Sequence, residues 1–100
     1  MAHIIETVTF KLTEGVTPEA FAAAAREANA YIEGCDGFVA RRLSRADDGT
    51  WIEHIEWRDM DAAKAAAAGI GDALGGSAFL SGIDGPTVEL RHSHLAVSVN

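Results

Sequence analysis

The stretch that decides the fold is residues 38–57, FVARRLSRADDGTWIEHIEW. Apolar and polar residues come close to alternating on both sides of Asp47-Asp48-Gly49, which predicts two strands, Phe38–Ala46 and Thr50–Trp57. An Asp-Gly step between two such runs is typical of a β-hairpin, so we expect the two strands to pair antiparallel.

The register of this hairpin depends on the length of its loop. A two-residue turn at Asp48-Gly49 places Arg41 opposite Glu56 and Leu43 opposite His54. A three-residue loop shifts every one of these pairings by one residue.

Each side of the hairpin carries further regular structure. Thr17 and Asp59 are side chains of the kind that cap helices, and Pro18 suits a first helical turn. The expected elements are a strand at His3–Leu12, a helix at Pro18–Gly34, a helix at Asp59–Leu74, one helical turn at Ala78–Ile83 and a strand at Thr87–Val97.

This βαββαβ order predicts an α+β fold of the ferredoxin-like type. It has a four-stranded antiparallel sheet with the first strand between the third and the fourth, and both helices on one face. With 100 residues we expect a single domain spanning residues 1–100.

The apolar residues are divided unevenly between these elements. Nineteen residues are alanine, and most of them fall on the two helices, whereas the bulky apolar residues gather on the strands at positions of both phases. In a sheet that is covered on one face only, apolar and polar residues should alternate more strictly along each strand. We therefore expect a homodimer in which a second copy of the chain covers the other face.

Charge and composition exclude several classes of function. The net charge of -7 argues against a nucleic-acid partner or an anionic membrane surface. No basic, apolar leader and no long apolar run is visible, so the expectation is a cytoplasmic protein with no membrane partner. The single Cys35 excludes an intramolecular disulfide.

Three features of the sequence are typical of one family. They are the strand Ile4–Leu12, the Gly37-Phe38 step into the second strand, and the run Glu56-Trp57-Arg58-Asp59-Met60-Asp61-Ala62. Together they resemble the antibiotic biosynthesis monooxygenase-like family of dimeric α+β barrels. In that family an acidic residue and a Trp end the third strand and lead into a capped, alanine-rich helix. The resemblance implies the dimeric barrel, and its members include cofactor-independent oxygenases of polycyclic phenols, haem-degrading enzymes and isomerases.

The haem-degrading branch of the family uses an Asn on the first strand, a Trp on the third and a His on the second helix. Trp57 corresponds to the Trp, but His3–Leu12 contains no Asn and Asp59–Leu74 contains no His. The sequence therefore disfavours haem degradation by that scheme, and no cofactor is expected.

Four histidines, His3, His54, His92 and His94, fall on predicted strands that also carry the carboxylates Glu6, Glu53, Glu56 and Glu89. Such a set is what a divalent metal would need, but no recognised metal motif accompanies it, so rim or interface positions are the simpler interpretation and no metal site is predicted. Arg41, Arg42 and Arg45 share one strand, and pairing with Glu53 and Glu56 across the hairpin is the simpler alternative to an anion site.

An imidazole that takes a phenolic proton fits the chemistry that the resemblance implies, since it titrates near neutral pH. His54 and His92 lie in mid-strand and are the candidate catalytic residues. Trp57 and Tyr31 are the candidates for binding an aromatic substrate, and the alternative for Trp57 is a plug at the end of the sheet under the second helix.

The alanines that face the sheet either allow close packing or leave a cavity between helices and sheet. Four glycines between Gly69 and Gly76 suit a movable lid over such a cavity, or an ordinary loose connection. Two readings of the function follow. The first is a cofactor-independent monooxygenase-like enzyme for a small aromatic or polyketide-like compound. The second is a non-catalytic small-molecule-binding or assembly domain on the same scaffold.

Overall fold

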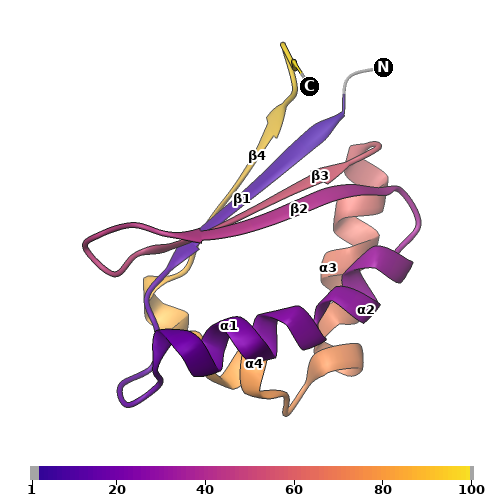
Figure 1. Ribbon diagram of the computed structural model, residues 1–100. Helices are drawn as coiled ribbons and strands as arrows, with labels where there is room; N and C mark the ends of the chain where they lie inside the picture. Colours follow the sequence, from indigo (N-terminus) through magenta and orange to yellow (C-terminus); the bar gives the residue numbers. More distant parts are fainter. Residues whose placement is uncertain (1–2, 100) are drawn as a thin grey trace.

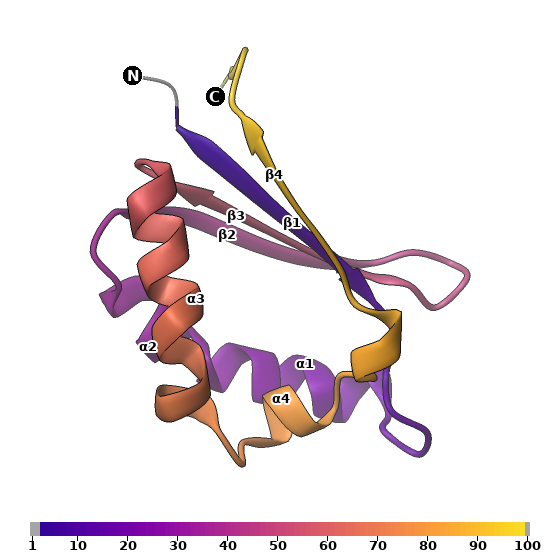
Figure 2. The same ribbon diagram turned by 180° about the vertical axis from the view of Figure 1, so that it is seen from behind.

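The structure is a computed structural model that describes residues 3–99. Its sheet has the strand order β2-β3-β1-β4, antiparallel throughout, and its helices lie on one face of that sheet (Figures 1 and 2). The predicted ferredoxin-like α+β fold is therefore confirmed. In chain order the elements are β1 (Ile4–Phe10), α1 (Pro18–Glu27), α2 (Asn29–Gly34), β2 (Phe38–Arg45), β3 (Trp51–Trp57), α3 (Met60–Leu74), α4 (Ala78–Ser81), a 3-10 turn (Gly85–Thr87) and β4 (Glu89–His94).

The β2–β3 hairpin closes with a three-residue loop, so the register expected for a two-residue turn is wrong. The Ala46 amide donates to the Thr50 carbonyl at 2.7 Å, and the Gly49 amide donates to the Ala46 carbonyl at 3.0 Å. Gly49 adopts φ +89°, which is the left-handed position that such a loop requires. Arg41 consequently lies opposite Ile55 and Leu43 opposite Glu53, the alternative that the longer loop predicts.

The expected helix Pro18–Gly34 is divided at Ala28 into α1 and α2. At this division the Ala25 carbonyl accepts a hydrogen bond at 2.8 Å from the Arg41 guanidinium on β2. A side chain of the sheet thus donates a hydrogen bond to a helix carbonyl close to the point where the helix is divided. Two caps are as expected, since the Thr17 hydroxyl accepts from the Ala20 amide and the Asp59 carboxylate from the Ala62 amide.

The last strand is shorter than Thr87–Val97. Its first expected residue, Thr87, belongs to the 3-10 turn, and its last paired residue, His94, lies opposite Ile4, where β1 begins. β4 is also the edge of the sheet that leaves most apolar surface exposed. Leu90 is 53% exposed and Val88, just before the strand, 40%.

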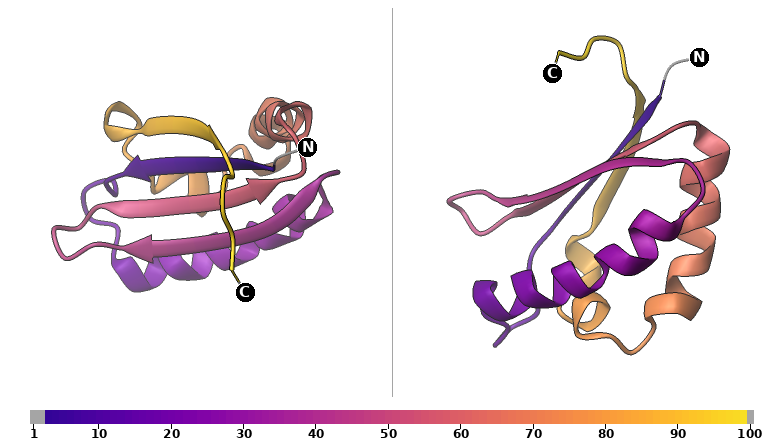
Figure 3. Two further views of the ribbon diagram at one scale, coloured as in Figure 1. Left: turned by 90° about the horizontal axis from the view of Figure 1, so that it is seen from above. Right: turned by 45° about the vertical axis from the view of Figure 1, so that its right-hand side comes forward.

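The helix-covered face of the sheet holds the core, and the two faces differ sharply in side-chain type. Buried aromatic rings meet there, with Phe21 of α1 packed on Trp51 at 4.9 Å and on Phe79 at 5.5 Å between ring centroids. The opposite face, which we call the open face, carries no helix of residues 3–99, as the two views of Figure 3 show. It includes Ile5, Thr7, Ile52, His54 and Glu56.

Within residues 3–99, no helix is long and apolar enough to cross a membrane.

Candidate functional site

A cavity of about 280 Å³ lies between the helix-covered face of the sheet and the helices α3 and α4. Its walls are almost entirely apolar, and the polar side chains among them are Glu6, Tyr31, Glu53 and Trp57. Its size is near the lower end of the roughly 300–1,000 Å³ typical of small-molecule sites. The remaining lining residues are Val8, Phe10, Ile32, Ile55, Ala66, Ala67, Ile70, Phe79, Leu80, Ile83, Val88 and Leu90.

Glu6 of β1 is the cavity carboxylate that is best placed to bind a ligand. Its Oε1 accepts a hydrogen bond from the Trp57 indole at 3.2 Å and lies 3.4 Å from Nε2 of His92. The other oxygen, Oε2, has no hydrogen-bond partner among residues 3–99. The Glu6 side chain is only 12% exposed, so a ligand in the cavity meets a fixed acceptor in an apolar surrounding.

Glu53 also faces the cavity, but both of its oxygens are already occupied. Arg41 donates to Oε2 at 2.9 Å through Nε and to Oε1 at 2.7 Å through Nη2, and both side chains are less than 10% exposed. For Arg41, an ion pair with a hairpin glutamate, which the sequence favoured over an anion site, is thus observed, with Glu53 as the partner. The pair is a bidentate ion pair that leaves little for a ligand to bind.

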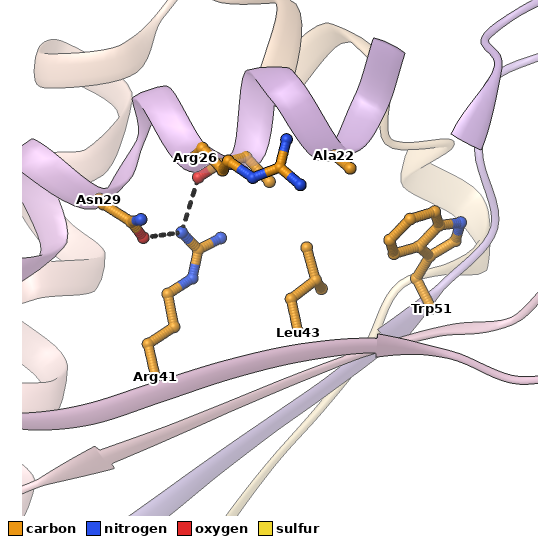
Figure 4. Close-up of a pocket in the computed structure, with 7 residues that line it drawn as sticks. Ala22, Arg26, Asn29, Arg41, Leu43 and Trp51 are labelled. Carbon is orange, nitrogen blue, oxygen red and sulfur yellow. Dashed lines mark hydrogen bonds between the residues drawn. The ribbon is translucent and has the colours of Figure 1, made fainter. Parts of the chain in front are cut away.

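Arg41 also joins β2 to the helices, at the edge of a second, lateral pocket of about 240 Å³ (Figure 4). Its Nη1 donates to the Ala25 carbonyl and to Oδ1 of Asn29, both at 2.8 Å. Its guanidinium lies 5.3 Å from the centroid of Phe79. The lateral pocket is thus bounded by an arginine whose hydrogen bonds hold the fold together.

Tyr31 of α2 reaches across the cavity to α3. Its hydroxyl donates to the Ala66 carbonyl at 2.7 Å, and a Cβ at Gly69 would lie 2.8 Å from that hydroxyl oxygen. Gly69 is therefore a helical residue that admits the tyrosine, and only Gly75-Gly76-Ser77 separates α3 from α4. Burial, with a smaller effect of Cys35, raises the pKa of Tyr31, so its hydroxyl stays protonated at neutral pH.

Two of the four predicted site residues, Trp57 and Tyr31, line this cavity. His92 does not line it, but its Nε2 lies 3.4 Å from Oε1 of Glu6, which does. Trp57 is 2% exposed and packs edge-on against Phe38, so it also closes the end of the sheet. His54 lies exposed on the open face, separated from the cavity by the sheet itself.

The two carboxylates of this cavity, the buried Glu53 and the partly buried Glu6, were not predicted as site residues, although the sequence contains a signal for them. Glu53 shares the alternate phase of Trp51, Ile55 and Trp57, all of which are buried. Glu6 has the same relation to Ile4 and Phe10 on β1. A carboxylate in the buried phase of a strand points toward a partner or a site.

The four strand histidines lie on different faces of the sheet. His3 and His54 lie on the open face, where Nδ1 of His3 contacts the Glu56 carboxylate, whereas His92 and His94 lie on the helix-covered side of β4. Among the residues that the structure describes, no three His, Cys, Asp or Glu side chains gather as a metal-ligand set.

Solved structures share this fold over nearly the whole chain. They include SnoaB, a cofactor-independent oxygenase from Streptomyces nogalater, with a TM-score of 0.69 and 19% identity, covering 100% of this chain and 97% of that chain. The heme-degrader MhuD from Mycobacterium tuberculosis, with two hemes bound in its active site, has a TM-score of 0.75 and 21% identity over 97% and 99% of the chains. A "putative Antibiotic biosynthesis monooxygenase" from Chloroflexus aurantiacus has a TM-score of 0.73 and 12% identity over 99% and 98%.

No family model and no curated protein matches the sequence. The structural likenesses confirm, at the level of the fold, the resemblance to the antibiotic biosynthesis monooxygenase-like family. At these identities they establish the fold alone.

The cavity residues do not fit a haem held in the manner of the haem-degrading branch. β1 has no Asn and α3 has no His, and the polar side chains that line the cavity are two carboxylates, an indole and the Tyr31 hydroxyl, which already donates to Ala66. The cavity volume of about 280 Å³ also suits a ligand that is much smaller than a porphyrin.

Proposed function

We propose that this protein is a cofactor-independent oxygenase that acts on a small phenolic aromatic compound in the cavity under α3 and α4. The observation that carries the proposal is the arrangement of Glu6, which lines an apolar cavity and whose oxygen Oε2 has no hydrogen-bond partner among residues 3–99. A ring bound among apolar side chains can present its hydroxyl to that oxygen. The shared fold with a cofactor-independent oxygenase supports the same class of reaction.

The proposed chemistry starts with removal of the phenolic proton. Glu6 accepts the proton from the substrate hydroxyl, and His92, 3.4 Å away and 24% exposed, passes it to water. Trp57 donates to the oxygen of Glu6 that the substrate does not use, which holds the carboxylate in place. His92 thus keeps the acid/base role predicted for it, acting through Glu6.

The electron-rich phenolate then reacts directly with O₂ at its unsubstituted para carbon. One oxygen atom becomes the new ring carbonyl, and the other leaves as water with the hydroxyl proton and the para hydrogen. For 1-naphthol the balance is C₁₀H₈O + O₂ → C₁₀H₆O₂ + H₂O, with all electrons supplied by the substrate. The apolar walls keep the reactive anion away from bulk water.

Oxygen uptake and quinone formation with 1-naphthol, measured in protein treated with a chelator, test this proposal. We expect Glu6→Gln to lower kcat by about a hundredfold, since it keeps the shape of the side chain but cannot take a proton. His92→Ala should lower kcat less and shift its pH profile. Unchanged turnover in Glu6→Gln, or turnover abolished by the chelator, would refute the proposal.

The His54→Ala variant separates the two predicted histidines. His54 lies on the other face of the sheet, so activity is expected to persist without it. Loss of activity in this variant alone would move the chemistry to the open face. Binding of 1-naphthol with no oxygen uptake in any variant would favour the non-catalytic, small-molecule-binding alternative.

We also propose that the protein is a homodimer whose interface is the open face. Ile5, which is 9% exposed, and the half-buried Ile52 are apolar residues of this face, to which His54 and Glu56 also belong. Light scattering should give twice the mass of one chain, and Ile52→Glu should give a monomer. A wild-type chain that stays monomeric at high concentration would refute this arrangement.

A further inference from the structure

Three polar side chains besides Trp57 line the cavity, and they differ in what they can offer a ligand. Both oxygens of Glu53 accept from Arg41, and the Tyr31 hydroxyl donates to the Ala66 carbonyl. On Glu6, Oε1 accepts from Trp57, whereas Oε2 has no partner within residues 3–99. The cavity therefore presents one strong acceptor to a ligand in an otherwise apolar space.

The volume of the cavity limits how much ring can be buried with that hydroxyl. A dry cavity of about 150 Å³ lined by aliphatic and aromatic side chains holds one benzene ring. The cavity here, at about 280 Å³, is nearly twice as large, which corresponds to two fused rings. Ile70 and Leu80 form part of its helical wall, while Val88 and Leu90, 40% and 53% exposed, lie toward solvent at the β4 edge.

From the single free acceptor and the volume together, we infer that the ligand class of this site is a planar two-ring aromatic compound with one hydroxyl directed at Oε2 of Glu6. This inference rests on the proposed function, because it uses the same cavity and the same carboxylate, and it narrows the substrate to two rings. A third fused ring extends past the buried volume toward the exposed β4 edge, where it gains little from burial.

Equilibrium binding measured without oxygen, so that no turnover occurs, tests the inference with phenol, 1-naphthol and 1-anthrol. Burial of the second ring is expected to tighten Kd at least about tenfold between phenol and 1-naphthol. The third ring of 1-anthrol should then change Kd by less than about threefold. A further tenfold gain with the third ring, or no gain with the second, would overturn the inference.

Two more measurements test the hydrogen bond from the ligand hydroxyl to Glu6 and the size limit set by the helical wall of the cavity. The methyl ether of 1-naphthol cannot donate to Glu6 and should bind about tenfold more weakly, and equal binding would overturn the assigned hydrogen bond. Ile70→Ala removes three carbon atoms from the wall, so 1-anthrol should gain affinity over 1-naphthol in this variant. Val39→Ala, on β2 and outside the cavity lining, is the matched control and should leave the series unchanged. If Ile70→Ala binds phenol, 1-naphthol and 1-anthrol with the same relative Kd values as wild type, cavity volume does not limit the size of the ligand, and the inference is overturned.

The outcomes for the ligand class and for the oxygenase reaction are distinguishable. If the two-ring preference holds but no variant consumes oxygen, the oxygenase proposal fails and the ligand class stands. If oxygen is consumed with three-ring phenols and not with 1-naphthol, the ligand class fails and the oxygenase proposal stands.

Discussion

Replacing Arg41 with methionine is expected to destabilise the fold by about 3–5 kcal/mol. The substitution keeps most of the apolar stem but removes all four hydrogen bonds of the guanidinium, two to Glu53, one to the Ala25 carbonyl and one to Asn29. It leaves the Glu53 carboxylate buried without a counter-charge.

The magnitude follows from how deeply the pair is buried. The side chains of Arg41 and Glu53 are 8% and 7% exposed, so water cannot replace the missing partner of Glu53. The oxygens of Ala25 and Asn29 are different, because the lateral pocket gives water access to them. Most of the loss therefore comes from Glu53, and the double variant Arg41→Met/Glu53→Leu should recover most of the stability or exceed that of wild type.

Urea denaturation followed by tryptophan fluorescence measures this change as a shift in midpoint at constant m-value. Arg45→Met is the matched control, since Arg45 is exposed on the same strand, and its effect should stay within about 0.5 kcal/mol. A loss of less than about 1 kcal/mol in Arg41→Met would refute the reasoning. So would a double variant no more stable than the single one.

Three further predictions concern the turns, a cap and the tyrosine. Gly49→Ala should lower the free energy of unfolding by about 1–2 kcal/mol, because Gly49 has a φ of +89°. Gly37→Ala should lower it clearly more, because Gly37 has a φ of +83° and an added Cβ would lie 2.5 Å from the Cβ of Ala62. Equal urea midpoints for the two variants would contradict this. The Ala62 amide, and then Arg58, lower the pKa of Asp59 below 3.8, so its contribution to stability is present above about pH 4 and is lost as the pH falls through the lowered pKa. Melting temperatures between pH 2 and 6 should show a shallower acid decline in Asp59→Asn, and identical curves would argue against it. Tyr31 is the single tyrosine and its pKa is raised by burial, so the midpoint of the phenolate absorbance should lie above pH 10.0. A midpoint below pH 10.0 would show that the hydroxyl is not desolvated.

Much of the fold could be predicted from the sequence because local signals agreed with the tertiary arrangement. The hairpin, the caps at Thr17 and Asp59 and the order of elements all depend on neighbouring residues. The register could not be decided from the sequence, because an Asp-Asp-Gly stretch suits a two-residue turn and a three-residue loop equally well. The division of the first helix at Ala28 was missed because it involves Arg41, a residue of a distant strand.

The candidate site was predicted only in part, for a physical reason. Which face of a strand meets the helices depends on register, and a shift of one residue exchanges the faces. His92 and Trp57 fell on the helix-covered face and His54 on the open one, a distinction that mid-strand position alone does not make. Glu6 required the partners of β1, which lie about 50 and 85 residues away in the sequence.

The position of β1 in the middle of the sheet also has a consequence for how the chain folds. β1 is the first strand in the sequence, yet its neighbours are β3 and β4. The hairpin β2–β3 can form from local contacts, but β1 gains its first partner only after β3, and its second only after β4. Closing such long loops is slow compared with local helix and hairpin formation. On a ribosome, β1 therefore has no strand partner until β3 has emerged, and it lacks its second partner until β4 has emerged. The Glu6 site, which includes a contact to His92 of β4, is therefore completed late.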